Sequence, residues 1–100
     1  MSNNRQNSDD KNQVKQASKD EKLARIRELE DVVAVMDTEA GRRFVWRLLS
    51  RAGVFTSSFT GNSTTFFNEG KRDQGLFLLS ETMEGCDELY YVMTRENKDK

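Results

Sequence analysis

The sequence of 100 residues contains no histidine and no proline, and its one cysteine is Cys86. A lone cysteine cannot close an internal disulfide, and without histidine it cannot complete a zinc site. Serine and threonine side chains likewise lack the imidazole that usually activates them as nucleophiles. We therefore expect no catalytic, cofactor-binding or metal-binding residue and no enzyme, and we expect Cys86 to pack as a small core side chain.

An excess of charge of one sign is also missing, because 16 lysines and arginines face 17 aspartates and glutamates. A uniformly basic DNA-coating protein is thereby excluded, and any contact with nucleic acid must be local. No apolar run comes near the roughly 20 residues that cross a bilayer, and the first residues are polar where a signal peptide is apolar. We expect a protein that is made in the cytoplasm and makes no membrane contact.

The absence of proline favours helices, and apolar residues recur at helical spacing in three stretches. The first predicted helix covers residues 20–36. Its apolar stripe consists of Leu23, Ile26, Leu29, Val33 and Met36. Extra valines near the end of this helix predict that the end is its better buried part. The second predicted helix covers about 38–52, with Asp37 as N-cap and Gly53 as the stop signal.

A loop rich in serine and threonine follows over residues 55–65, and we expect Phe55 and Phe59 to hold it against the helices. The third predicted helix begins near Thr64 or Thr65 and is the longest. Its apolar residues alternate spacings of three and four, as in a heptad seam: Leu76, Leu79, Met83, Cys86, Tyr90 and Met93. Because glycine weakens a helix interior by about 1 kcal/mol, a bend is expected near Gly70 to Gly75.

Residues 1–19 carry Met1 and Val14 as their only large aliphatic side chains, which predicts a disordered polar arm. The arm is either a solubilising tail or a tether that orders on a partner. Residues 20–96 form one helical domain, and residues 97–100 form a frayed tail. The predicted fold class is all-α: a small three-helix domain, made of a helical hairpin and a long third helix, behind a disordered N-terminal arm.

The second helix carries an aligned row of arginines, Arg42, Arg43, Arg47 and Arg51, beside Phe44 and Trp46. One interpretation is that this row tracks a phosphate backbone. The other is that it pairs within the chain with an acidic row on the third helix, Glu81, Glu84 and Glu88. The nearly neutral net charge favours the second interpretation.

Methionine and aromatic side chains are numerous for a chain of this size. Met36, Met83 and Met93 with Leu79 and Tyr90 form either the core or an adaptable docking face. Three short helices rarely bury every apolar stripe, so we also expect self-association or docking on a larger protein.

Two stretches carry a family resemblance: Gly41-Arg-Arg-Phe-Val-Trp-Arg-Leu-Leu-Ser-Arg-Ala-Gly53, and Phe66-Phe-Asn-Glu-Gly-Lys-Arg-Asp-Gln-Gly75 with the Leu-Phe-Leu-Leu that follows. Over about residues 28–94 the chain resembles a family of small phage proteins, found in the structural gene blocks of Bordetella-phage-like and related tailed phages near the portal and capsid genes. The matching motif positions are Arg42, Arg43, Phe44, Trp46, Glu69, Gly70, Lys71, Arg72 and Asp73. We interpret the Lys71-Arg72 pair as a partner for acidic side chains near the start of the second helix.

The resemblance implies a virion- or packaging-associated accessory protein without an active site. It acts by protein–protein contacts in head assembly, in DNA packaging or as an internal, ejected component. Its expected partners are portal, capsid or internal proteins, with self-association or docking on a larger assembly, and it is expected in the host cytoplasm during assembly and then in the virion. The alternative is a small regulatory protein that binds DNA or an acidic host factor. We predict partner contacts at Arg42, Arg43, Trp46, Arg47, Arg51, Lys71, Arg72, Tyr90 and Met93.

Overall fold

The computed structural model describes the backbone of residues 2–56 and 64–98, and the side chains of residues 10–56 and 64–98. Three helices account for almost all of these residues: α1 (Ser2–Met36), α2 (Glu39–Arg51) and α3 (Thr64–Asn97). No strand occurs in these two segments. The all-α prediction with three helices is confirmed.

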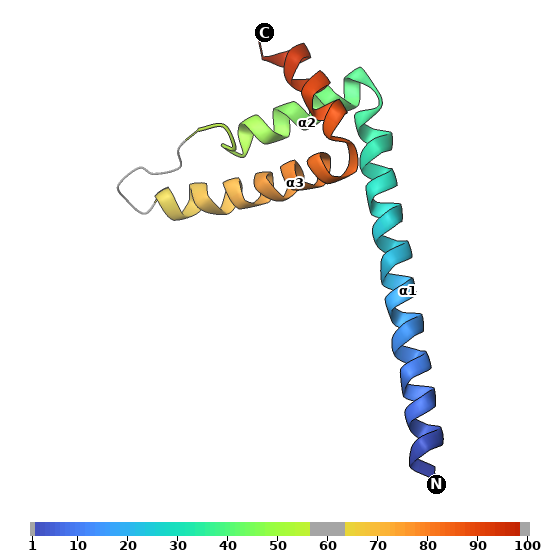
Figure 1. Cartoon of the computed structure of the whole chain (residues 1–100). Helices are drawn as coiled ribbons and strands as arrows, with labels where there is room; N and C mark the ends of the chain where they lie inside the picture. The colour runs from blue at the N-terminus through green and yellow to red at the C-terminus, as the bar shows by residue number, and fades with distance from the viewer. Residues whose placement is uncertain (1, 57–63, 99–100) are drawn as a thin grey trace.

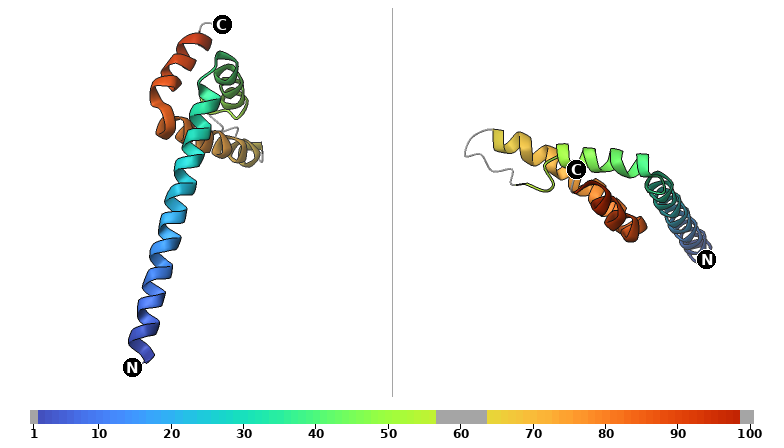
Figure 2. Two further views of the ribbon diagram at one scale, coloured as in Figure 1. Left: turned by 90° about the vertical axis from the view of Figure 1, so that its right-hand side faces the viewer. Right: turned by 90° about the horizontal axis from the view of Figure 1, so that it is seen from above.

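The three helices form a corner with one long projecting arm (Figure 1). The first part of α3 runs antiparallel to α2, and the last part of α3 turns back toward the junction of α1 and α2. The two further views show that α1 continues far beyond the other helices (Figure 2). The radius of gyration is 20.1 Å, against about 13 Å for a compact domain of this length. The chain is therefore elongated.

The described side chains in the first part of α1 are exposed. Every side chain from residue 10 to residue 24 is exposed, and the first partly buried one is Arg25. The polar arm predicted over residues 1–19 lies in this projecting part. α1 begins at Ser2 and so includes this arm. The predicted burial of the end of α1 is confirmed, because Met36 is fully buried while Leu23 is 63 % exposed.

A capping hydrogen bond and a close contact between the end of α1 and Gly41 fix the start of α2. Thr38, and not Asp37 as predicted, is the N-cap: its Oγ accepts a hydrogen bond of 3.0 Å from the amide of Gly41. Gly41 has no room for a side chain, since a Cβ there would lie 1.8 Å from the carbonyl oxygen of Val35. At the other end, Gly53 adopts the predicted left-handed conformation with φ 77°.

The bend in α3 lies at Cys86 and not at the predicted Gly70 to Gly75. The backbone of Cys86 is non-helical (φ −164°, ψ 68°), which lets the last part of α3 fold back across the corner. Gly75 instead marks a crossing point, because a Cβ there would lie 2.5 Å from Ala52 Cβ and from Val54 Cγ2. The predicted heptad seam is thus not straight, and its members Leu76 and Met83 remain exposed.

The core is small and lies where the three helices meet. Its fully or nearly fully buried hydrophobic side chains among the described residues are Met36, Val45, Leu49 and Met93. Cys86 and Tyr90 are among the partly buried residues that pack against them. Burial raises the pKa of the Cys86 thiol above its ordinary value, with a smaller contribution from Asp87, so the thiol stays protonated. This matches the predicted core role of Cys86.

Candidate interaction surfaces

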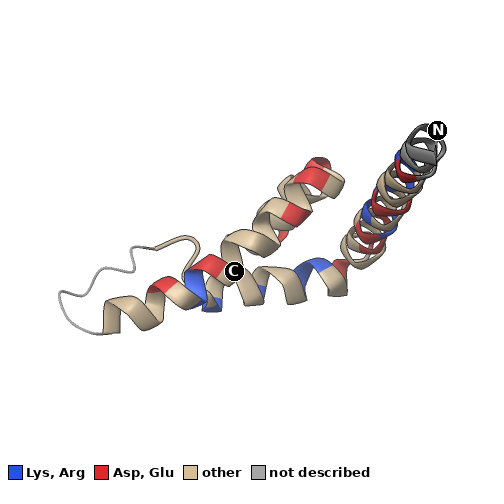
Figure 3. Ribbon diagram, turned by 90° about the horizontal axis from the view of Figure 1, so that it is seen from below, with Lys and Arg blue, Asp and Glu red and all other residues tan. Residues whose placement is uncertain are grey.

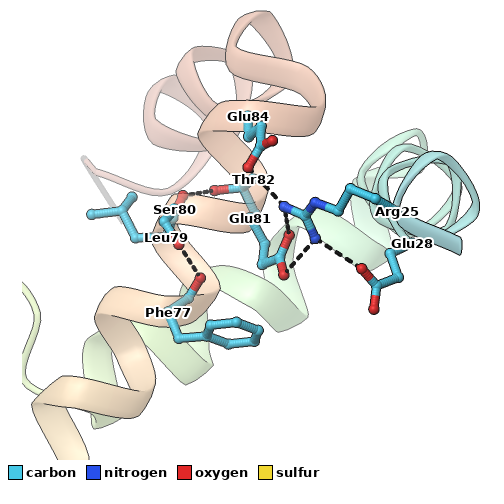
Figure 4. A network of polar contacts seen from close by, with 8 residues as sticks. All are labelled: Arg25, Glu28, Phe77, Leu79, Ser80, Glu81, Thr82 and Glu84. Atoms are coloured by element: carbon cyan, nitrogen blue, oxygen red, sulfur yellow. Dashed lines mark hydrogen bonds and ion pairs between the residues drawn. The ribbon is translucent and has the colours of Figure 1, made fainter. Parts of the chain in front are cut away.

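The most extensive polar network ties α1 to the middle of α3 (Figure 4). The Arg25 guanidinium donates 3.0 Å and 2.7 Å hydrogen bonds to Glu81 and Glu84, and it lies 3.1 Å from Glu28. These hydrogen bonds from Arg25 hold the pKa of Glu81 below its ordinary range, although burial acts in the opposite direction. Arg25 of α1 therefore binds Glu81 and Glu84, two of the three residues of the acidic row on α3.

This network contradicts the prediction that the arginine row of α2 pairs with the acidic row Glu81, Glu84 and Glu88 of α3. Glu81 and Glu84 contact Arg25, a residue outside the apolar stripe predicted for the first helix. Among the described ion pairs, none joins Glu88 to an arginine of α2. Arg25 precedes Leu29, Val32 and Met36 at spacings of four, three and four, so it lies on the side of α1 that packs against α3.

Arg42 is the one arginine of the row that is largely buried, with its side chain 12 % exposed. Its Nε and Nη2 donate to the two carboxylate oxygens of Glu96 at 2.7 and 2.9 Å, and its Nη1 donates to the carbonyl oxygen of Met36 at 2.9 Å. The bonds to Glu96 raise the pKa of Arg42. Arg42 thus joins the end of α1, the start of α2 and the end of α3, and it is a structural clamp.

The other arginines of the row stay at the surface. Arg43 is 56 % exposed and lies 3.6 Å from Glu39, and the guanidinium of Arg47 lies 5.7 Å from the centre of the Phe44 ring. We call this exposed side of α2 the arginine face. It consists of Arg43, Phe44, Arg47, Leu48 and Arg51, all exposed. Such a face offers charge and aromatic contact to a partner.

Lys71 and Arg72 lie at the opposite end of the hairpin from their predicted partners. Lys71 lines a cavity with Arg51 and Gly53 at the end of α2, and its Nζ lies 5.2 Å from the centre of the Phe67 ring. The predicted pairing with acids at the start of α2 is wrong, because α2 and the first part of α3 run antiparallel. Arg72 is half-buried.

The three apolar residues predicted to contact a partner lie in or against the core. Trp46 is half-buried and stacks on Phe55, with ring centres 5.0 Å apart, which confirms the predicted contact of Phe55 with the helices. Tyr90 is half-buried and meets Tyr91 edge to face at 5.5 Å. Met93 is fully buried, so its assignment to a partner surface is corrected. The predicted contact of Phe59 falls outside the described residues.

An apolar groove that the sequence analysis missed runs along one side of the corner. Two adjoining hollows that share Leu78 make up this surface, which we call the corner groove. It is lined by Val32, Val35, Val45, Leu48, Ala52, Gly75 and Leu78 together with Asp31, Met36, Gln74 and Thr82. Leu48 and Ala52 lie four residues apart on one side of α2, which the sequence could have revealed. Only the antiparallel hairpin brings Gly75 beside them.

Glycine also sets the distance between α1 and α3. A Cβ at Gly85 would lie 3.3 Å from Val32 Cγ1 and 3.5 Å from the carbonyl oxygen of Leu29. Beside this crossing lies a second hollow, lined by Ile26, Leu29, Glu30, Val33, Glu84 and Gly85. Glycine weakens a helix interior, but at this position it permits the close crossing.

Two further properties of the described segments bear on function. No helix in them combines the length and apolar character needed to span a membrane. Within the same residues, no cluster of three or more histidine, cysteine, aspartate or glutamate side chains has the arrangement of a metal site.

In the comparison with protein families, residues 32–95 match the Bbp19-like phage protein family. The matched range begins near the end of α1, contains all of α2 and reaches nearly to the end of α3, so it includes the corner and leaves out the projecting arm. It also agrees with the resemblance found over residues 28–94. The comparisons with curated proteins and with solved structures gave no match. Because the match spans well over half of the chain, this protein belongs to the Bbp19-like phage protein family.

Proposed function

We propose that this phage protein is a non-enzymatic accessory component of a tailed-phage particle that works by binding other structural proteins. It acts in head assembly, in DNA packaging or as an internal component ejected with the genome. The observation that carries the proposal is the imbalance between a small core and a large exposed apolar surface. Phe44, Phe77 and Tyr91 are each more than half exposed, while few hydrophobic side chains in the described segments are buried.

The corner groove is the surface that best fits such a partner. Val35 and Leu48 on its rim are 48 % and 41 % exposed, and Leu78 lies at its middle. A groove between helices with an apolar lining suits an amphipathic helix that inserts side chains at every third or fourth position. The portal, capsid and internal proteins are the expected sources of that helix.

Two features support a role without catalysis. The chain has no histidine, and Glu81 and Glu84, neighbours on one side of α3, are both engaged by Arg25. The hydrogen bonds from Arg25 keep Glu81 ionised near neutral pH, whereas a general acid needs a raised pKa. The protonated thiol of Cys86 is similarly a poor nucleophile.

A mass-spectrometric inventory of purified, nuclease-treated particles tests the proposal. The chain should be found at a reproducible copy number in mature virions of the phage that encodes it, in procapsids, or in both. Presence in virions establishes a structural or ejected component, and presence only in procapsids establishes an assembly factor. Absence from both particles contradicts the proposal.

A second candidate function rests on the arginine face. Because Arg43, Arg47 and Arg51 are exposed and are not covered by the acidic row of α3, they are available to DNA or to an acidic host factor. Binding of a labelled duplex should then weaken steeply with salt, and a double R43E/R47E variant should lose it. The matched control is R95E, which reverses an exposed charge on the last turn of α3. Equal, salt-insensitive behaviour of all three proteins excludes this candidate.

A further inference from the structure

The exposed side of α1 carries a seam that none of the described residues covers. Its members follow one another at spacings of four, three, four and three, and we call them the α1 seam: Lys19, Leu23, Ile26, Glu30 and Val33. This is the spacing by which two helices pair side by side. Leu23 is 63 % exposed and Ile26 is 52 % exposed. Contact with α3 centres on the neighbouring side of α1, through Arg25 and Val32. Ile26, Glu30 and Val33 border the hollow beside that contact.

The exposure of the first part of α1 also supports pairing of this seam with a second helix. All side chains from residue 10 to residue 24 are exposed, and the hydrogen bond of 3.1 Å from Gln16 to Asp20 is local to the helix. In proteins most of the stability of a helix comes from tertiary packing of an apolar face. A helix packed on the α1 seam would supply the missing contacts.

We propose that the α1 seam pairs with the α1 seam of a second copy of this chain, in antiparallel orientation, about a two-fold axis between Leu23 and Ile26. In this register Leu23 packs on Ile26 of the second copy, and Lys19 lies opposite Glu30 of the second copy. The two-fold symmetry repeats each contact, so the pair has a small apolar centre with an ion pair on either side.

Charges on the flanks of the seam fit the same register. On one flank, Asp20 lies opposite Arg27 of the second copy. On the other flank, Lys22 of the second copy lies in the hollow between α1 and α3. Leu29 and Glu84 line this hollow, so the lysine meets an apolar side chain and a carboxylate there. Figure 3 shows that basic and acidic residues alternate along α1, which is the mixed pattern that an antiparallel self-pairing requires.

The parallel arrangement is disfavoured by the same residues. An in-register parallel pair sets Lys19 against Lys19 and Glu30 against Glu30, which brings like charges together in both layers next to the apolar centre. Like charges in contact oppose association. The charge order along α1 therefore selects the antiparallel pair over the parallel one.

This inference goes beyond the proposed function, because it concerns the purified chain alone and uses a surface separate from the corner groove. Sedimentation equilibrium of the full chain should show a monomer–dimer equilibrium. Either K19E or E30K should raise the dimer Kd about tenfold or more, since each reversal places two like-charge contacts in the pair. The double variant K19E/E30K should restore the wild-type Kd.

Matched controls separate the register from net charge. K11E and E21K make the same charge changes on exposed sides of α1 away from the seam, and they should leave the dimer Kd nearly unchanged. Circular dichroism at a concentration where every variant is monomeric should give the same helix content for all of them. For orientation, L23C mixed with I26C in a C86S background should give a mixed disulfide in preference to either homodimer.

Three results overturn the inference. A wild-type chain that stays monomeric to millimolar concentration excludes the pair. An oligomer that responds no more to K19E and E30K than to the controls places self-association on another surface. If K19E and E30K each weaken the dimer and the double variant does not restore the wild-type Kd, the antiparallel register is excluded.

Discussion

The corner and the projecting arm are both helical, but different forces hold them. In the corner, three helix faces bury Met36, Leu49 and Met93, and Arg42 clamps three chain segments with hydrogen bonds of 2.7 to 2.9 Å. In the arm, from residue 10 to residue 24, every side chain is exposed. Helical structure is therefore weak proof of stability, because burial and not helix content distinguishes the two regions.

Core truncation should produce the largest difference between the two regions. Leu49→Ala should lower the free energy of unfolding by about 2 to 5 kcal/mol, because Leu49 is fully buried at the centre of the corner. Val14→Ala, in the arm and 68 % exposed, should change it by less than about 0.5 kcal/mol. Urea denaturation followed by circular dichroism measures both. Similar losses in the two variants would show that the arm is part of the same cooperative core.

A pair of glycine substitutions should sharpen the comparison within α3 itself. Gly75→Ala should destabilise the fold by about 1 to 3 kcal/mol, because the new Cβ lies 2.5 Å from Ala52 Cβ and Val54 Cγ2. Gly70→Ala meets no atom within 4 Å and should stabilise α3 by up to about 1 kcal/mol through helix propensity. The melting temperature of each variant reports the sign. If Gly75→Ala were also stabilising, the close crossing of α2 and α3 would not hold in solution.

The cap at the start of α2 should have a smaller effect. Thr38→Ala removes the side-chain acceptor for the Gly41 amide and should cost about 1 kcal/mol of unfolding free energy. Asp37→Ala is the control, since Asp37 precedes the cap and should change stability by less than half as much. The reverse order of the two losses in urea denaturation would reinstate Asp37 as the cap.

The smallest expected effect is the pH dependence that comes from Glu81. Its folded pKa lies below the ordinary glutamate value because Arg25 donates to the ionised carboxylate. Its contribution to stability is therefore complete above the ordinary value and is lost as the pH falls through the lowered folded pKa. The difference in unfolding free energy between wild type and Glu81→Gln should shrink between about pH 5 and pH 3. A difference that stays constant across this range would mean that Arg25 does not perturb Glu81.

Local signals explain what could be predicted from the sequence about each region. The spacing of Leu29, Val33 and Met36 and the stop at Gly53 place the ends of α1 and α2 to within a few residues, since hydrophobic period and left-handed glycine are properties of short windows. The exposure of the arm was predictable as well, because its composition has almost nothing to bury. The family resemblance was also available, since it rests on contiguous stretches such as Gly41-Arg42-Arg43.

The candidate surfaces depended on long-range placement. Arg25 was not among the predicted contact residues, because a charged side chain adds nothing to an apolar stripe, yet it meets Glu81 from a segment 56 residues away. Lys71 was assigned to the start of α2, but the antiparallel hairpin puts it at the end. The non-helical backbone at Cys86 then turns α3, which buries Met93 and leaves Leu76 exposed on what had been predicted to be one continuous seam.

By itself, the sequence determined the helical class, the number of helices, the approximate ends of α2 and the family to which the chain belongs, because each depends on neighbouring residues. Only the tertiary structure decided which charges pair, where α3 bends and which apolar faces remain open. Those outcomes depend on how helices cross, and the crossing is set by contacts such as Gly75 against Ala52 and Gly85 against Val32, between residues far apart along the chain.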